Sequence, residues 1–280
     1  MIRGMTIDDI GFAAALVASE GWIGETPAVF EGFIENDCCG CFVAEDGGAP
    51  VGMCVSTRYG DSGFVGELIV NNNRRGEGIG KQLFDRALDH LESAGTKSVC
   101  LDADLDAVPF YERNGFRKIC RSLRFVGVVE GRAHPAVRQA FAADMPAVIR
   151  LDKERFGADR SFFLERRLRL FSEFCLVFEA EGEIEGYIMA QPGLGVLSVG
   201  PCLARGATPC AAGLIGALSE RVGEVRLRIG TLESNVDACR LIRSFSGLEE
   251  GAPCWRMVRG RGDGLGGHAD LFAIGSAAKG

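Results

Sequence analysis

The chain alternates between segments with the apolar spacing of strands and segments with the apolar spacing of helices. The segment FVAEDGGAPVGMCVS (42–56) is typical of two strands joined by a tight acidic turn with glycines, which predicts a hairpin. The segment DDIGFAAAL (8–16) is typical of an acidic N-cap followed by a helix. Across the first half, this pattern predicts helices near 8–19, 25–36, 79–94 and 106–113. It predicts strands near 41–46, 50–58, 63–70, 97–103 and 115–127. Together these elements predict an α+β fold with a mixed sheet.

The same pattern occurs twice along the chain. The hairpin segment can be laid over LVFEAEGEIEGYIMA (176–190), and the first helical segment matches ADMPAVIRL (143–151). The two copies lie about 130 residues apart, which indicates a duplicated domain rather than a short-period solenoid. We therefore expect one domain over 1–130 and a second over 131–280, with ADLFAIGS near the end as a last strand.

The composition is that of a soluble globular protein, since 47% of the 280 residues are hydrophobic and 25% are charged. The apolar runs are too short to span a bilayer and the N-terminus lacks a signal-peptide pattern, so we expect a cytoplasmic protein with no membrane partner. The 11 cysteines are then expected to be reduced thiols. No Cys or His pair lies at zinc spacing from Cys38, Cys39 and Cys41, so we expect no metal.

The net charge of −7 is unevenly distributed. Residues 1–130 carry 12 basic and 20 acidic side chains, whereas residues 131–280 carry 19 and 18. An acidic first half argues against nucleic acid as a partner. It mildly favours a cationic acceptor, although an acidic surface that only aids solubility explains the charge equally well.

Glycines gather in NNNRRGEGIGKQL (71–83), directly after the apolar strand GELIV. A helix N-terminus offers unpaired N–H groups and a positive dipole end, so this turn is a candidate phosphate site. A P-loop is excluded because Arg75 stands at its early glycine position and Gln82 at its Ser/Thr position. The dinucleotide fingerprint GxGxxG is excluded because its last position falls on Lys81 or Leu83. The alternative interpretation, a glycine-rich turn that binds no ligand, stays open.

The remaining pattern, Arg75-x-x-Gly78-x-Gly80, resembles the acyl-CoA pyrophosphate loop of the GNAT superfamily of N-acetyltransferases. A second motif, AVPFYERNGF (107–116), resembles the fourth-helix signature of that family. The resemblance implies two tandem GNAT-like domains, each with a mixed, mostly antiparallel twisted sheet flanked by helices. It implies acetyl-CoA as cosubstrate, held by Leu68, Ile69, Val70, Arg75, Gly76, Glu77, Gly78, Ile79, Gly80, Lys81 and Asp104.

The resemblance also implies chemical roles. Tyr111 has the position of the tyrosine that protonates the departing thiolate, and the alternative is a tyrosine packed in the core. Glu67 precedes the strand expected to pair with pantetheine and is a candidate base if burial raises its pKa. An edge charge or a contact with a substrate ammonium are the alternatives for Glu67. Trp22, in the segment EGW, is expected on the acceptor side.

The likeness covers nearly the whole chain. Segments such as LDKERFGADR (151–160) resemble tandem GNAT proteins that carry a YitH-type acetyltransferase domain at the C-terminal end. The second half departs from the catalytic pattern, because Pro201 and Pro209 remove N–H donors and Ile242 stands at the tyrosine position. We therefore expect residues 131–280 to form a degenerate GNAT-like domain that supports the first domain or closes its acceptor side.

These observations predict an acyl-CoA-dependent N-acyltransferase whose active site lies in residues 1–130. It would transfer acetyl from acetyl-CoA to a small-molecule or peptide amine by direct attack, without a covalent enzyme intermediate. A non-enzymatic acyl-CoA sensor or binding module is the alternative, since it needs the same loop but no turnover. A pure interaction scaffold would bind no CoA at all.

Overall fold

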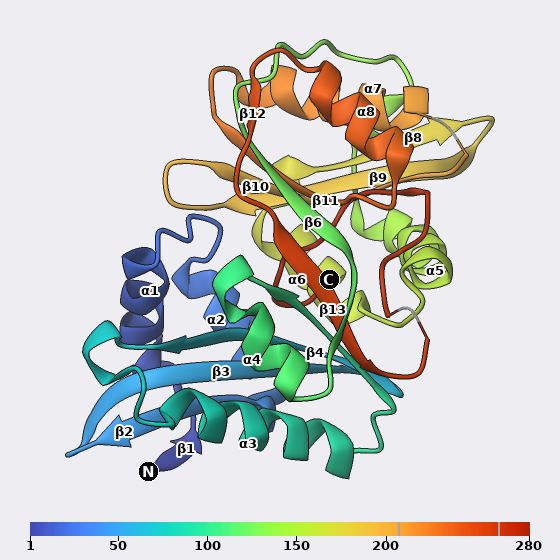
Figure 1. The fold of residues 1–280 in the computed structure, drawn as a ribbon. Coiled ribbons are helices and arrows are strands. Elements are labelled where there is room, and N and C mark those ends of the chain that lie inside the picture. The colour runs from blue at the N-terminus through green and yellow to red at the C-terminus, as the bar shows by residue number, and fades with distance from the viewer. Residues whose placement is uncertain (207, 263) are drawn as a thin grey trace.

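One sheet of 14 strands runs through both halves of the computed structural model, which describes residues 1–206, 208–262 and 264–280 (Figure 1). The strands of the first half are β1 (Ile2–Gly4), β2 (Cys41–Asp46), β3 (Ala49–Tyr59), β4 (Ser62–Val70), β5 (Ser98–Ala103) and β6 (Arg117–Gly127). The later strands are β7 (Val137–Gln139), β8 (Cys175–Ala180), β9 (Glu183–Pro192), β10 (Leu197–Ala204), β11 (Leu227–Leu232), β12 (Leu248–Glu250), β13 (Cys254–Gly260) and β14 (Leu271–Ala273).

Helices lie on both faces of this sheet. Among the described residues they are α1 (Ile10–Ser19), α2 (Pro27–Asp37), α3 (Ile79–Ser93), α4 (Val108–Arg113), α5 (Met145–Phe156), α6 (Ser161–Leu170), α7 (Thr208–Val222) and α8 (Val236–Ser244). Each helix and strand predicted for the first half is present within a few residues of its predicted range, and the predicted last strand is β14.

The sheet is mixed and mostly antiparallel, as predicted. Its strands follow the order β1-β2-β3-β4-β5-β13-β6-β11-β10-β9-β8-β7, with β12 also beside β6 and β14 beside β10. Among the described residues, the parallel pairs are β4 with β5 and β10 with β11. A parallel neighbour requires a crossover connection, which α3 supplies in the first half and α7 in the second.

The two halves exchange strands. β13 comes from the end of the chain but lies between β5 and β6, where it pairs with both. β6 in turn extends beyond β13, and its residues 122–127 pair with β11 of the second half. Figure 1 shows β6 and β13 crossing the middle of the molecule together. The sheet is therefore continuous across the predicted domain boundary near residue 130.

The helices of the first half cover opposite faces of its sheet. Phe30 and Phe33 of α2 share one buried cluster with inward residues of β2 and β3, such as Met53. Leu83 and Phe84 of α3 share another cluster with residues from the other face of those strands. Successive side chains of a strand point to opposite faces of the sheet, so those of β2 to β4 alternate between two separate cores.

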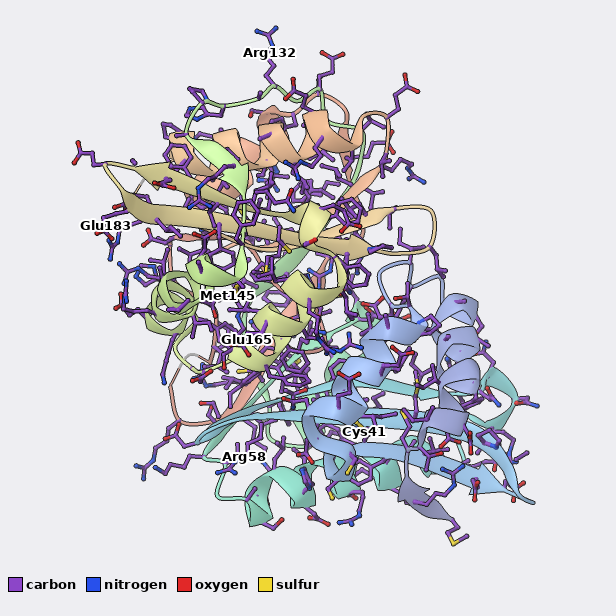
Figure 2. The ribbon with its side chains drawn as sticks, turned by 180° about the vertical axis from the view of Figure 1, so that it is seen from behind. Cys41, Arg58, Arg132, Met145, Glu165 and Glu183 are labelled. Atoms are coloured by element: carbon purple, nitrogen blue, oxygen red, sulfur yellow. The ribbon has the colours of Figure 1, made fainter. Side chains whose placement is uncertain are left out.

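A third core joins the halves. It contains Tyr59 and Phe64 from the first half and Tyr187 from the second, packed with buried residues of α5 and α6. Figure 2 shows this region from behind, with Met145 at the start of α5 and Glu165 in α6 between the two parts of the sheet. This shared core fixes the relative position of the halves.

A buried charge cluster connects the exchanged strands. Arg256 of β13 pairs with Asp102 of β5, and Arg124 of β6 bonds the same carboxylate at 2.9 Å. Burial alone would raise the pKa of Asp102, but the two guanidinium groups hold it below its ordinary value. Asp102 is therefore ionised, and one carboxylate stabilises three adjacent strands.

The described part of the chain holds no helix long and apolar enough to cross a membrane. Its 11 cysteines are free thiols. No group of three or more His, Cys, Asp or Glu side chains is placed to hold a metal ion among the described residues. The cluster of Cys38, Cys39 and Cys41 includes two exposed thiols and one that is buried.

Candidate active site

Two adjoining cavities lie where β4 and β5 separate. The first, here called the loop groove, has a volume of about 360 Å³ and is lined by Leu68, Ile69, Val70, Arg75, Gly76, Ile79, Gly80 and Phe110, among others. The second, here called the central cavity, has a volume of about 340 Å³ and is lined by Glu25, Glu67, Asp102, Arg124, Arg228 and Cys254, among others. Trp22 and Asp104 line both cavities, so the two spaces meet at these side chains.

The separation of β4 from β5 creates the loop groove. The strands pair at residues 62–64 with residues 98–100, and beyond this point no strand of the described residues lies beside the β5-facing edge of β4. The register with β3 shifts further along, between Gly66 and Ile69, and Glu67 there adopts a φ of 52°, a left-handed conformation that is uncommon for glutamate. Beyond the bulge, Leu68 to Val70 line the groove along the edge of β4 that faces away from β3.

The glycine turn forms the other wall of the groove. Gly76 and Gly78 have φ values of 85° and 81°, which only glycine adopts without strain. The first backbone bond of α3 runs from the N–H of Gln82 to the carbonyl of Gly78. The N–H groups before it have no intrahelical partner and are available to an anion. At Gly80 an added Cβ would lie 3.6 Å from the Val70 side chain, so the groove passes close to bare backbone.

The two basic side chains predicted to hold the cofactor at this turn lie in different places. The Arg75 side chain lines the groove, bonds the Val70 carbonyl at 3.0 Å and pairs with Glu20 at 2.6 Å. Lys81 instead pairs with Asp85, one turn along α3. Of the eleven predicted cofactor residues, eight line the groove, whereas Glu77, Gly78 and Lys81 do not.

Tyr111 lies beneath the groove rather than in its wall. Its ring packs edge-on against Phe84, Phe110 and Phe116, with 8% of the residue exposed. Its helix neighbour Phe110 lines the groove. Burial raises the pKa of Tyr111, with smaller contributions from nearby thiols and the Asp104 carboxylate. The phenol therefore keeps its proton at neutral pH, as a proton donor must.

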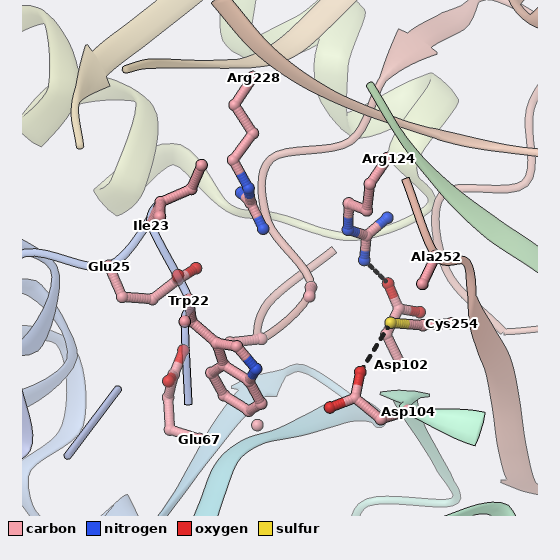
Figure 3. Close-up of a pocket in the computed structure, with 14 residues that line it drawn as sticks. Trp22, Ile23, Glu25, Glu67, Asp102, Asp104, Arg124, Arg228, Ala252 and Cys254 are labelled. Atoms are coloured by element: carbon pink, nitrogen blue, oxygen red, sulfur yellow. Dashed lines mark hydrogen bonds and ion pairs between the residues drawn. The ribbon is translucent and has the colours of Figure 1, made fainter. Parts of the chain in front are cut away.

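Two buried carboxylates that face the central cavity each have one oxygen without a hydrogen-bond partner among the described residues (Figure 3). The Oε2 atoms of Glu25 and Glu67 have no hydrogen-bond partner among the described residues, and both side chains are nearly fully buried. Burial raises the pKa of Glu67 well above its ordinary value, and the Glu25 charge raises it further, while Lys279 and Arg228 lower it. Orphaned buried oxygens of this kind require a donor, which an amine or a water could supply.

Several cavity residues were not predicted from the sequence. Arg124 comes from β6 and Cys254 from β13, where its thiol lies 3.1 Å from Asp104. Arg228 comes from β11 of the second half, and Ala277 and Ala278 follow β14. No local motif marks these residues, because contacts between segments far apart in the sequence bring them to Glu67.

The equivalent slot in the second half is filled by the chain itself. β10 pairs with β11 only at residues 197–199, and its register with β9 shifts at Gly200 and Pro201, as β4 shifts at Glu67. β14 then pairs with β10 at Cys202 and Leu203. The β10 edge that matches the loop groove therefore already has a strand beside it.

Asn235 fixes this strand in place. Its side-chain amide donates to the carbonyls of Ala269 and Leu271 at 2.7 and 3.0 Å, and its oxygen caps α8 by accepting from Ala238 N–H. Ile242, at the predicted tyrosine position, is fully buried in the core of this half. The departures noted in the sequence thus coincide with an occupied slot.

Comparison with known protein families identifies the family to which the chain belongs. A family profile described as an acetyltransferase (GNAT) domain matches residues 37–118, and a second profile of the same description matches residues 148–273. The chain carries two GNAT acetyltransferase domains in tandem. These matches fall on either side of residue 130 and cover both halves of the sheet. The profiles carry only the general GNAT description, so the YitH type stays a prediction.

Individual relatives support the tandem GNAT fold. A protein from Pyrococcus horikoshii described as a candidate acetyltransferase has 24% identity and a TM-score of 0.85, covering 100% of this chain and 95% of that one. A tandem GNAT protein from the clavulanic acid biosynthesis pathway has 14% identity and a TM-score of 0.65, with coverage of 94% and 98%. Glucosamine 6-phosphate N-acetyltransferase of Trypanosoma brucei brucei is 36% identical over 62 residues, which span 22% of this chain and 42% of that protein.

The raised pKa of Glu67 predicts how a tandem GNAT variant responds to pH. Below about pH 4.3, the pKa of glutamate in an unfolded chain, the Glu67 carboxyl is neutral in both the folded and the unfolded protein. The stability of the folded protein that depends on this neutral form is then lost as the pH rises through the raised pKa of folded Glu67. Glu67→Gln cannot ionise, so it should raise the free energy of unfolding more at pH 8 than at pH 4. Urea denaturation at both pH values measures this, with exposed Glu249→Gln as control. An equal effect at both pH values would contradict a buried Glu67 with a raised pKa.

Proposed function

We propose that the first GNAT domain is an acyl-CoA-dependent N-acyltransferase that transfers acetyl from acetyl-CoA to an amine. The observation that carries this proposal is the meeting of the loop groove and the central cavity at Trp22 and Asp104. The loop groove offers the edge of a strand and the N–H groups of a helix start, and the central cavity offers carboxylate oxygens without hydrogen-bond partners. A two-substrate transfer requires such adjoining sites, because holding both reactants in line supplies much of the rate acceleration.

In this proposal the cofactor follows the loop groove. The pyrophosphate lies against the N–H groups of the glycine turn at the start of α3, with Arg75 adding charge-assisted bonds after it leaves Glu20. The pantetheine arm pairs with the free edge of Leu68 to Val70, as an added strand pairs with a sheet. The thioester then reaches the junction with the central cavity near Asp104.

The amine enters from the central cavity and attacks the thioester carbonyl directly. The C–N bond forms, and backbone N–H groups of Leu68 to Val70 stabilise the oxyanion. Glu67, directly or through a water, accepts the proton that the amine loses. The C–S bond then breaks, and the thiolate leaves with a proton donated by Tyr111, giving the amide and free CoA.

The second half supports this site and holds no second cofactor. β14 lies beside β10 where a pantetheine arm would pair, and Asn235 bonds that strand. The second half also supplies Arg228 and Cys254 to the central cavity. The acceptor side of the active site is thus built by both halves, and acetyl-CoA should bind once per chain.

Titration of acetyl-CoA into the pure protein tests the proposal. We expect one equivalent to bind, and Gly80→Asp to weaken binding by about a hundredfold or more, because its carboxylate opposes the pyrophosphate at the helix start. Gly11→Asp is the matched control, since Gly11 is the second residue of α1 as Gly80 is of α3, and is exposed. No binding to wild type would overturn the proposal. Two equivalents would contradict the filled second slot.

Replacement of Tyr111 by phenylalanine tests the proton donor. The ring packs among aromatic side chains, so Tyr111→Phe should keep the fold and the acetyl-CoA affinity. Loss of a general acid should lower kcat by about a hundredfold. The first acceptor to assay is glucosamine 6-phosphate, the substrate in the name of the curated relative, followed by a wider amine panel. Unchanged kcat would remove Tyr111 from the mechanism, and binding without turnover on any amine would indicate a sensor.

A further inference from the structure

Arg228 occupies an unusual place in the central cavity. It projects from β11 of the second half, and its guanidinium points into the space between Glu25 and Arg124 (Figure 3). The residue is mostly buried, and the mechanism above gives it no role. A buried guanidinium normally requires a carboxylate or several carbonyl oxygens to compensate for lost hydration.

Arg228 lacks such partners. Its hydrogen bond among the described residues is a long one, 3.5 Å to the Ser198 hydroxyl, and Glu25 and Glu67 act on it only through space, without a hydrogen bond. Arg124, its neighbour in the cavity, makes three hydrogen bonds instead. It bonds Asp102 at 2.9 Å, the Ser122 hydroxyl at 2.7 Å and the Leu123 carbonyl at 2.9 Å. The donors of Arg228 are therefore available to a ligand.

The surrounding chain leaves space for this guanidinium. A Cβ at Gly24 would lie 2.5 Å from the Arg228 Nη1 atom, so any side chain there would displace the group. A Cβ at Gly230 would lie 3.3 Å from Nη1 of Arg124. In the sheet, Arg228 pairs with Val126 and Arg124 pairs with Gly230, so the two arginines are diagonal neighbours on one face.

The charged side chains of the cavity are unevenly placed, with Asp102 paired to Arg124 and Glu25 near Arg228. Figure 3 shows Arg228 and Arg124 entering from one side, while Glu67 and Asp104 lie on the opposite side, near the loop groove. An amine that carries no anionic group would pair with the carboxylates but would leave Arg228 without a partner. An acceptor that carries both an amine and an anion would satisfy both sides.

We infer that the acceptor is an amine that also carries a carboxylate or phosphate group, which Arg228 binds while the amine faces Glu67. This inference rests on the proposed acyltransferase function and identifies the acceptor class for the same site. It departs from the cationic acceptor that the acidic first half mildly favours, because that net charge does not show where the arginines of the second half lie. Arg228 is a specificity-determining residue in this account, since it touches the acceptor but no reacting atom.

Matched acceptor pairs test the inference. Glucosamine 6-phosphate against glucosamine removes a phosphate, and phenylalanine against phenylalaninamide removes a carboxylate. The amide has the more easily deprotonated amine, so a preference for the amino acid cannot arise from amine basicity. We expect kcat/KM to favour the anionic member of at least one pair, and the preferred pair to distinguish phosphate from carboxylate.

Arg228 variants connect this preference to the residue. Arg228→Gln should lower the anionic-to-neutral ratio of kcat/KM by about tenfold to a hundredfold, as expected for loss of a charge-assisted bond. Arg228→Lys should keep part of it. Arg226→Gln, two residues earlier and exposed, should leave it unchanged. Preference for the neutral members, or an equal loss on both members in Arg228→Gln, would overturn the inference while leaving the acyltransferase proposal intact.

A binding measurement decides the case if no pair is turned over. Inorganic phosphate is titrated into protein saturated with acetyl-CoA, so that the glycine turn is already occupied. Phosphate binding to wild type and to Arg226→Gln, but not to Arg228→Gln, would support the anion site. No binding to wild type, or equal binding to all three proteins, would overturn it. Failure of acetyl-CoA itself to bind would instead overturn the underlying function.

Discussion

The insertion of β13 between β5 and β6 is the constraint on which the rest of the structure depends. Because β13 pairs with both strands, β6 is displaced towards β11 and the two GNAT domains share one sheet. Asp102 stabilises this arrangement by accepting bonds from Arg256 and Arg124 in a buried site. Loss of one partner from such a cluster leaves an uncompensated buried charge and typically costs about 3–5 kcal/mol.

The shared sheet explains why the proposed active site uses both domains. The first domain supplies the splayed strand, the glycine turn and Glu67, which are the parts that would hold and activate a thioester. The second domain supplies Arg228 and, through β13, Cys254. In the proposed function the duplication gives two equivalent positions for a cofactor, and β14 occupies the second one from within the chain. In this proposal one copy carries the chemistry, whereas the other supports it.

Local features of the fold could be predicted from the sequence, whereas long-range ones could not. Apolar periodicity and the glycine turn predict α3 and β4, because each depends on neighbouring residues, whereas the bulge at Glu67 is a finding of the structure. Strand exchange depends on pairing between residues about 150 apart, such as Arg256 and Asp102, and no local pattern encodes it. For the same reason the sequence indicated Glu67 and Trp22 but not Glu25 or Arg228. The expectation of a cationic acceptor arose from net charge, which does not describe the cavity.

The most direct test of this account is a crystal structure of the complete chain with acetyl-CoA bound. We expect one cofactor per chain, with its pyrophosphate at residues 76–81, its pantetheine arm beside residues 68–70 and its thioester at the junction of the two cavities near Asp104. β14 should remain beside β10. A cofactor found between β10 and β11 with β14 displaced, or a thioester directed away from the central cavity, would contradict the central claim that one active site is built from two domains.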